Sequence, residues 1–153
     1  MIIRGYNSED QEHVEKLIRD SLSGIEEKYN EEELRHLESV ITEMVAGFAE
    51  EEKFRFFVVE DENNLLGCAG LNIENGRVAG IFVNPANQGV GVGSRLMKKL
   101  EGKAREKDLE KLEATASISA GDFYRKLGFD LVEKDKSEIE GKEISVNRME
   151  KRL

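Results

Sequence analysis

Three glycines, Gly89, Gly91 and Gly93, occupy alternate positions in the segment IFVNPANQGVGVGSRLMKKL, residues 81–100. A β-branched run precedes them and an amphipathic helical pattern follows. The first turn of a helix carries unpaired N–H groups and partial positive charge, so it can bind an anion. Glycines at this point let several backbone amides approach the same anion. The pattern therefore predicts a phosphate-binding loop; the alternative is that the glycines serve only a tight turn or close packing.

Two well-known phosphate loops fit this segment poorly. The pattern G-x-x-x-x-G-K-[ST] needs Lys and then Ser or Thr after its last glycine, whereas Ser94 and Arg95 follow Gly93. The dinucleotide pattern G-x-G-x-x-G/A nearly matches from Gly89, but it ends on Ser94 and NPAN separates it from the preceding strand. These mismatches disfavour a nucleotide-binding oxidoreductase.

Few other side chains suggest catalysis. His13 and His36 fall in predicted helices, where surface positions are expected. The single cysteine, Cys68, lies on a predicted interior strand and excludes an internal disulfide, which fits a reducing compartment. Glu74, at the end of a predicted strand, is a candidate general base acting through a water molecule. We expect no metal site.

The charge is unevenly distributed along the chain of 153 residues, whose net charge is −9. Residues 1–64 carry 18 acidic and 7 basic side chains, against 14 and 16 in residues 65–153. The first part is therefore a poor candidate for binding nucleic acid and a better one for cationic ligands, while the second part could accept an anion.

The length and pattern indicate a single domain spanning residues 1–153, with no linker or internal repeat. No apolar run approaches about 18 residues, and the N-terminus has no charged-then-apolar leader. We therefore expect a cytoplasmic protein without a membrane partner.

Local patterns predict the element order β-α-α-β-β-β-α-β-α-β-β. Ser8 is expected to cap the first helix and Asn30 the second, and Gly128 to end the last one. A strand, helix, strand unit at residues 78–116 lies between hairpins, which predicts a mixed sheet with helices on both faces. The expected strands are 1–6, 54–60, 65–73, 77–83, one within 109–117, 130–134 and 143–153, and the later helices are 91–107 and 119–127.

The segment QGVGVG, residues 88–93, matches the [QR]-x-x-G-x-[GA] signature of the GNAT acetyltransferase superfamily. In addition, SISAGDFYRKLGF, residues 117–129, resembles the family segment A-x-x-F-Y-x-K-x-G-F, IFVNP resembles the strand before the loop, and RMEKRL the last strand. The resemblance covers roughly residues 65–153, whereas residues 1–64 match only in element order. It implies an α/β (α+β mixed) fold with a central, mixed, mostly antiparallel sheet. This sheet would be splayed between the strands before and after the acetyl-CoA loop and helix.

The resemblance also implies an N-acetyltransferase that transfers an acetyl group from acetyl-CoA directly to a primary amine. Loop amides would hold the pyrophosphate, backbone groups of the preceding strand would pair with the pantetheine arm, and Tyr124 would meet the leaving thiolate. Ser117 stands where many members have an asparagine. The implied cofactor-binding residues are Phe82, Val83, Gln88, Gly89, Val90, Gly91, Val92, Gly93, Ser94, Ser117 and Tyr124, and the candidate catalytic residues are Tyr124 and Glu74.

Two questions stay open at this level. Many family members carry a glutamate on the strand before the loop, and RVAGIFV has none, so a non-catalytic acyl-CoA-binding or sensing module is the alternative; Tyr124 favours the enzyme. The acceptor side of the family is formed by the first two helices, and here it is acidic, with Glu26, Glu27 and residues 31–33. That charge favours a cationic amine, such as a polyamine, an aminoglycoside-like molecule or a basic peptide terminus. A homodimer is also compatible with the sequence.

Overall fold

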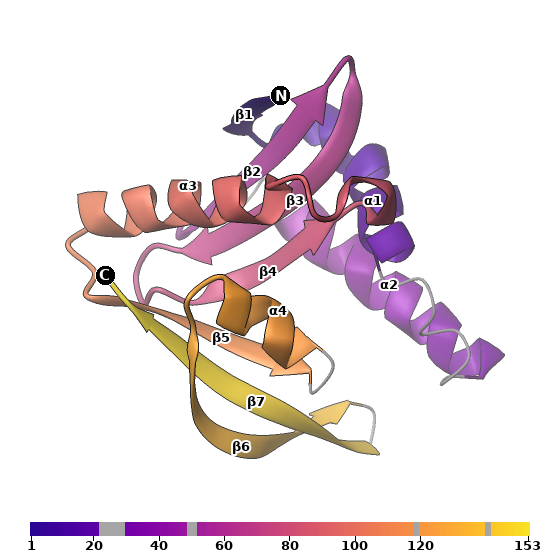
Figure 1. Cartoon of the computed structure of the whole chain (residues 1–153). Coiled ribbons are helices and arrows are strands. Elements are labelled where there is room, and N and C mark those ends of the chain that lie inside the picture. Colours follow the sequence, from indigo (N-terminus) through magenta and orange to yellow (C-terminus); the bar gives the residue numbers. More distant parts are fainter. Residues whose placement is uncertain (22–29, 49–51, 118–119, 140–141) are drawn as a thin grey trace.

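Strands and helices follow one another in the order that the sequence patterns predict (Figure 1). The computed structural model describes residues 1–21, 30–48, 52–117, 120–139 and 142–153. Its elements are β1 (Ile2–Gly5), the 3₁₀ turn η1 (Ser8–Asp10), α1 (Gln11–Ser21), α2 (Glu31–Phe48), β2 (Phe54–Asp61), β3 (Asn64–Asn72), β4 (Val78–Val83), the 3₁₀ turn η3 (Pro85–Asn87), α3 (Val92–Glu106), β5 (Lys111–Ser117), α4 (Gly121–Lys126), β6 (Asp130–Ile139) and β7 (Lys142–Arg152). β6 continues beyond the predicted strand 130–134 to Ile139, because it pairs with β7 from Asp130 to Ile139. β7 begins and ends one residue before the predicted strand 143–153.

The strands form two antiparallel sheets that separate between β4 and β5. The first sheet has the order β1-β2-β3-β4 and the second β5-β7-β6. An isolated parallel bridge between Arg77 and Glu113 joins them, and the Glu113 N–H donates to the Gly76 carbonyl oxygen at 2.9 Å. Beyond this bridge β4 and β5 diverge, as Figure 1 shows. We call this divergence the fork; it confirms the predicted splay between the strands that flank the loop and helix.

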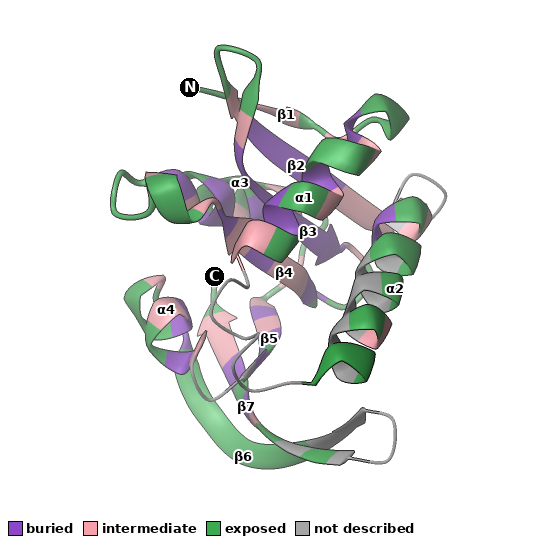
Figure 2. Cartoon of the chain, turned by 90° about the vertical axis from the view of Figure 1, so that its right-hand side faces the viewer, coloured by how far each residue is buried: buried purple, intermediate pink, exposed green. Residues whose placement is uncertain are grey.

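Helices cover both faces of the first sheet, as predicted (Figure 2). On one face the buried side of α3 packs against β2, β3 and β4, and on the other α1 packs against Val58 and Cys68. Because both faces are covered, the central part of β3 is buried without alternation. No helix in the described ranges is long and apolar enough to cross a membrane. The buried residues of α3 are Val92, Leu96, Met97, Leu100 and Ala104.

The start of the first helix differs from the prediction, because Asn7 rather than Ser8 is the capping residue. The Asn7 side-chain oxygen accepts from the Glu9 N–H at 3.0 Å, and the Asp10 carboxylate accepts from the Asn7 N–H at 2.9 Å. This reciprocal pair is a capping box, and it begins a 3₁₀ turn before the α-helix. Arg4 on β1 donates to both carboxylate oxygens of Asp10 at 2.8 Å. The Arg4 guanidinium holds the pKa of the Asp10 carboxyl below its ordinary value. Because Arg4 is on β1, this pair connects the helix cap to the first sheet.

Candidate functional site

The loop between β4 and α3 presents backbone rather than side chains to its surroundings. Asn84 caps η3 with its side-chain oxygen, which accepts from the Ala86 N–H at 3.0 Å. α3 then begins at Val92, with Gly91 as an N-cap residue that offers no side-chain hydrogen bond. The first turn of α3, all of it described, contains no acidic residue. The first amides of α3 are therefore uncapped by side chains, which is the arrangement that binds anions at helix N-termini.

Glycine is present at the three loop positions for different physical reasons. Gly89 and Gly91 have φ of 81° and 90°, in the left-handed region that strains other residues. A Cβ at either position would meet nothing within 4 Å, so the space over the loop is open. At Gly93, outside that region, a Cβ would lie 3.4 Å from the Phe123 ring and 3.8 Å from the Val83 side chain. Gly93 therefore permits close packing of α3 against α4 and β4, while the first two glycines shape the open loop.

The remaining loop residues divide in the same way between exposed and buried positions. Gln88, Val90 and Ser94 are exposed, and Val90 keeps 60% of its surface in solvent. Val92 is 1% exposed, because its side chain enters the core between α3 and the first sheet. Of the expected cofactor contacts, the one at Val92 could therefore come only through its backbone amide.

A β-bulge in β4 lies next to the fork. The register pairs Gly70 with Gly80 but Leu71 with Val78, so Ala79 has no residue opposite it. Gly80 has φ of 150°, and a Cβ there would lie 2.6 Å from the Phe82 ring. The bulge therefore depends on glycine at this position, and it re-aims the part of β4 that borders the fork.

The register of β4 decides which of its amides face the fork. The Asn84 N–H donates to a β3 carbonyl oxygen at 2.8 Å, and Phe82 pairs with Cys68. Because bonding direction alternates along an antiparallel strand, the backbone of Phe82 faces β3 and the backbones of Ile81 and Val83 face the fork. The Phe82 backbone is thus engaged by β3, while Ile81, which sequence reasoning did not name, faces the fork beside Val83. A bulge cannot be read from VAGIFV, so this register was not predictable; the cofactor contacts expected at Phe82 and Val83 stay predictions.

Tyr124 is fixed by the way in which α4 ends. Gly128 has φ of 97° and its N–H donates to the Arg125 carbonyl oxygen at 3.0 Å, while the Phe129 N–H donates to the Tyr124 carbonyl oxygen at 3.0 Å. This pair of bonds is a Schellman motif, whose usual apolar contact is here the edge-to-face pair of Tyr124 and Phe129, 5.3 Å between ring centroids. Phe123 contributes a second edge-to-face contact at 5.6 Å. The predicted helix end at Gly128 is confirmed.

Lys151 supports this turn from β7. Its Nζ donates to the Leu127 carbonyl oxygen at 2.6 Å and forms an ion pair with Glu101 on α3. A Cβ on Gly128 would lie 2.9 Å from the Lys151 side chain, so glycine is needed there for space as well as for conformation. α3, α4 and β7 are thus joined below the residue that the resemblance assigns to catalysis.

The Tyr124 hydroxyl lies at the fork. The residue is 8% exposed, and its oxygen meets the backbone of Ile81. Burial raises the pKa of Tyr124 to about 12, and the Ile81 backbone hydrogen bond partly opposes that rise. A backbone N–H that donates to the phenol oxygen has this effect, since it stabilises the phenolate. The hydroxyl is therefore protonated at neutral pH, beside a strand edge whose amides face the fork.

Other candidate residues do not join Tyr124. Glu74 is exposed in the turn after β3, where its N–H donates to the Asn72 side-chain oxygen at 2.9 Å, on the far side of the bridge that closes the fork. Ser117 is the last residue of β5, and its side chain lies outside the part that the structure describes. Cys68 is fully buried, and burial raises its pKa to about 12, so its thiol is unreactive. Among the described residues, no group of His, Cys, Asp and Glu is arranged to hold a metal ion.

Asn147 is a buried polar residue that sequence reasoning missed. It lies on β7, is 6% exposed, and its side-chain oxygen has no hydrogen-bond partner in the described part of the structure. Its side-chain nitrogen would lie 3.0 Å from a Cβ on Gly121, at the start of α4. The signal was present in the sequence, because Asn147 is two positions from the buried Met149 and so shares its face of the strand.

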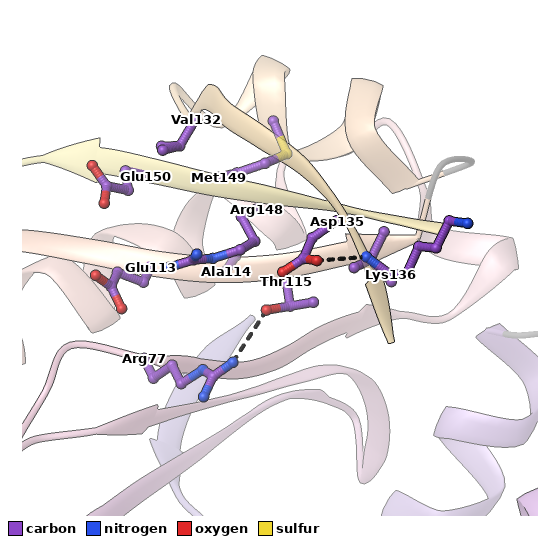
Figure 3. A pocket seen from close by; sticks show the side chains of 11 residues that line it. Arg77, Glu113, Ala114, Thr115, Val132, Asp135, Lys136, Arg148, Met149 and Glu150 are labelled. Carbon is purple, nitrogen blue, oxygen red and sulfur yellow. Dashed lines mark hydrogen bonds between the residues drawn. The ribbon is translucent and has the colours of Figure 1, made fainter. Parts of the chain in front are cut away.

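A polar groove of about 350 Å³ lies on one face of the second sheet (Figure 3). Glu113 and Thr115 line it from β5, and Arg77 reaches it from the position just before β4. Side chains alternate along β5, and Leu112 and Ala114 are buried in the core that contains α3 and α4. The groove therefore opens on the face that α3 and α4 leave uncovered, next to the closed end of the fork.

Comparison with known proteins agrees with this geometry. A family model described as an acetyltransferase (GNAT) domain matches residues 25–153. An amino-acid acetyltransferase of Neisseria meningitidis is 30% identical over 92 residues, which is 58% of this chain and 21% of that protein. The chain thus spans about a fifth of the length of the curated relative.

Solved structures show the same fold over nearly the whole chain. A GCN5-related N-acetyltransferase from Rhodopseudomonas palustris superposes with a TM-score of 0.82 at 22% identity, covering 99% of this chain and 95% of the other. The PaiA N-acetyltransferase from Thermoplasma acidophilum, in complex with coenzyme A, gives 0.76 at 18% identity, with 99% and 98% covered. Since the family model covers most of the residues, including the loop, the fork and Tyr124, this chain belongs to the GNAT acetyltransferase family.

Proposed function

We propose that this protein is a single-domain N-acetyltransferase that transfers an acetyl group from acetyl-CoA directly to a primary amine in a ternary complex. The observation that carries the proposal is the position of Tyr124. A buried, protonated phenol meets the Ile81 backbone at the edge of β4 that faces the fork. A group of this kind is of use where negative charge develops next to it, as it does on the sulfur of a thioester that is being cleaved.

The residues around the fork fit acetyl-CoA. The uncapped amides at the start of α3 and the open space over Gly89 and Gly91 suit its pyrophosphate. The fork-facing backbone of Val83 suits the amides of its pantetheine arm, which would add to the edge of β4 like a short strand. Gln88 and Ser94 flank the loop as further contacts. When bound, acetyl-CoA supplies an acetyl group that is activated as a thioester.

Transfer requires one bond to form and one to break. The neutral nitrogen of the acceptor bonds to the acetyl carbon, the carbon–sulfur bond breaks, and one proton leaves the nitrogen. Coenzyme A departs as the thiol after its sulfur has gained a proton. An N–H of β4 that faces the fork would stabilise negative charge on the acetyl oxygen. Tyr124 would donate a hydrogen bond to the sulfur as the charge on it grows.

The pKa of Tyr124 defines this role more narrowly. A free thiol has a pKa of about 8.5, whereas burial raises the pKa of Tyr124 to about 12. The phenol is thus the weaker acid, and a complete transfer of its proton to a thiolate is unfavourable. Tyr124 therefore acts mainly as a hydrogen-bond donor, and the proton that completes the thiol comes in the end from solvent.

The acceptor amine must lose a proton, and Glu74 is the proposed base. Because its turn lies beyond the bridge that closes the fork, Glu74 would act through water rather than by direct contact with the amine. Its exposure at the β3–β4 turn leaves it in contact with solvent. The acidic N-terminal region by itself favours an acceptor amine that carries positive charge. Part of that region, residues 22–29, lies outside the described residues, so this choice stays a prediction. The buried, reduced Cys68 supports a cytoplasmic setting.

A second candidate function is an acyl-CoA-binding module without catalysis. The observation in its favour is that β4 has no acidic side chain from Val78 to Val83. Calorimetry with acetyl-CoA and with NAD, followed by thiol release in the presence of a panel of primary amines, tests both functions. Binding of acetyl-CoA with amine-dependent thiol release is the expected result. Binding without release from any amine would favour the module, and preferential binding of NAD would exclude both.

A further inference from the structure

The groove on the open face of the second sheet contains charges of both signs. Arg77, Lys136 and Arg148 line it together with Glu113, Asp135 and Glu150. The core that contains α3 and Tyr124 lies on the other face of β5, so among the described elements the groove face offers an acceptor a route to the fork. The charge pattern of the groove therefore bears directly on what the acceptor is. This argument rests on the proposed acetyl transfer.

Most of these charges already have partners within the chain. The Lys111 ammonium lies 3.2 Å from the Glu113 carboxylate and 2.8 Å from that of Glu150. Across the groove, Arg148 pairs with Glu133 at 2.8 Å. At the far end of the groove, the Lys136 ammonium lies 3.3 Å from the Glu143 carboxylate.

Arg77 differs from the other basic residues of the groove. Among the described residues no carboxylate pairs with it; its guanidinium donates to the Thr115 hydroxyl oxygen at 3.2 Å. A guanidinium has five N–H donors, so this bond leaves most of them available. Figure 3 shows the Arg77 side chain extending from just before β4 toward Thr115 on β5.

The reach of Arg77 carries its charge along β5, away from its own backbone position. Its backbone bridges to Glu113, yet its guanidinium contacts Thr115, two residues further along β5. Two residues of a parallel strand span about 6.6 Å, and this displacement runs toward the open end of the fork. The guanidinium thus lies between the closed end of the fork and the level of the Ile81 amide, on the side from which an acceptor enters.

We propose that Arg77 binds a carboxylate of the acceptor, and that the acceptor is therefore an amino acid or a similar amine that bears a carboxylate close to its reactive nitrogen. Arginine is suited to this because its planar guanidinium can hold a carboxylate through two parallel hydrogen bonds. The carboxylate would take the donors that Thr115 leaves unused. Polyamines and aminoglycosides have no carboxylate. The proposal therefore distinguishes acceptors that bear a carboxylate from the purely cationic amines that the N-terminal charge favours.

The test compares acceptors that differ only in the carboxylate. Each of the standard L-amino acids is assayed beside its C-terminal amide, with spermidine as a carboxylate-free polyamine, for thiol release from acetyl-CoA. Binding of the same compounds to the protein saturated with coenzyme A is measured by calorimetry, which does not depend on turnover. The variants are Arg77→Gln, Arg77→Lys and the matched control Arg148→Gln, which removes a groove arginine that already has a carboxylate partner.

We expect at least one amino acid to exceed its amide by tenfold or more in kcat/KM or in affinity. Arg77→Gln should lower that value roughly 10- to 100-fold, mainly through KM, because the variant loses a charge-assisted hydrogen bond to the carboxylate. Arg77→Lys should recover part of it, Arg148→Gln should change it less than threefold, and acetyl-CoA affinity should be the same in all variants.

Two outcomes would overturn the proposal. In the first, the amides or spermidine match or exceed every amino acid in kcat/KM and in affinity. In the second, Arg77→Gln lowers these values by the same factor for the amino acids and for their amides. If amino acids bind through Arg77 but no acceptor releases thiol, the carboxylate site stands and the proposed catalysis fails. The two inferences therefore fail separately.

Discussion

Replacing Tyr124 with phenylalanine tests the proposed chemistry most directly. The change keeps the ring, and with it the edge-to-face contacts to Phe129 at 5.3 Å and Phe123 at 5.6 Å. It removes the phenol hydroxyl that the structure places at the fork. Because a thioester sulfur carries little charge before the bond breaks, the lost hydrogen bond matters mainly in the transition state. We expect kcat to fall about 100-fold or more, which corresponds to roughly 2.7 kcal/mol, with little change in acetyl-CoA affinity.

The fold should survive this change. Loss of the hydroxyl leaves the Ile81 N–H without its contact, and a neutral hydrogen bond of this kind contributes about 1 kcal/mol. The free energy of unfolding at neutral pH should therefore fall by about that amount. Tyr6→Phe is a matched control, because Tyr6 also packs edge to face on a phenylalanine, Phe56, but in the core on the α1 side of the sheet. It should leave kcat unchanged.

Single-turnover measurement of thiol release is the appropriate assay, since slow product release could otherwise hide a slower chemical step. Acetyl-CoA binding is measured on the same preparations by calorimetry. A folded Tyr124→Phe variant whose single-turnover rate stays within two- or threefold of the parent would refute the assignment of Tyr124 as the donor. A large loss of acetyl-CoA affinity would instead assign the hydroxyl to ground-state binding.

Three further predictions follow from the same geometry. Burial raises the pKa of Tyr124 in the folded protein to about 12, so above pH 10 the unfolded chain loses this proton while the folded protein keeps it. Between pH 10 and 12 the free energy of unfolding, measured by urea denaturation, should therefore fall by up to about 3 kcal/mol more in the parent than in Tyr124→Phe. Gly91→Glu should weaken acetyl-CoA binding about tenfold or more beyond Gly91→Asn, since both variants bear the strain of φ 90° and only glutamate adds negative charge. Equal dissociation constants for the two Gly91 variants would show that no anion binds there. Gly80→Ala should lower the free energy of unfolding by about 1–3 kcal/mol in the same assay, because φ is 150° there and the new Cβ would lie 2.6 Å from the Phe82 ring. An unchanged urea midpoint would contradict the need for glycine in the bulge.

The order of elements could be predicted because local patterns determine it. The apolar spacing of α1 and α3, and the continuous apolar runs of β2 and β3, each correspond to one kind of element. Asn7 shows the limit of this reasoning. Asn7 and Ser8 are both good capping residues, and the choice between them depends on Asp10. The Asp10 carboxylate is held by Arg4, which lies on β1. A contact of this kind is tertiary, so no local pattern reveals it.

The details of the site were harder to predict, because they depend on register. One unpaired residue, Ala79, determines that the amides of Ile81 and Val83 rather than Phe82 face the fork. A bulge has no fixed sequence signature beyond an adjacent glycine, and Gly80 could equally have been a simple weak point in the strand. The role of Arg77 was equally hidden, since it depends on which of the groove's carboxylates are already paired.

The segment FYRKLGF was recognisable from sequence because its residues serve structure and chemistry together. Gly128 supplies the left-handed residue that ends α4, and Phe129 and Tyr124 form the hydrogen bond and the ring contact that complete the motif. These requirements fix the spacing of tyrosine, glycine and phenylalanine. The same spacing holds the phenol ring so that its hydroxyl reaches Ile81 across the fork. A helix end that is specified by local sequence thus places the Tyr124 hydroxyl against a strand of the other sheet.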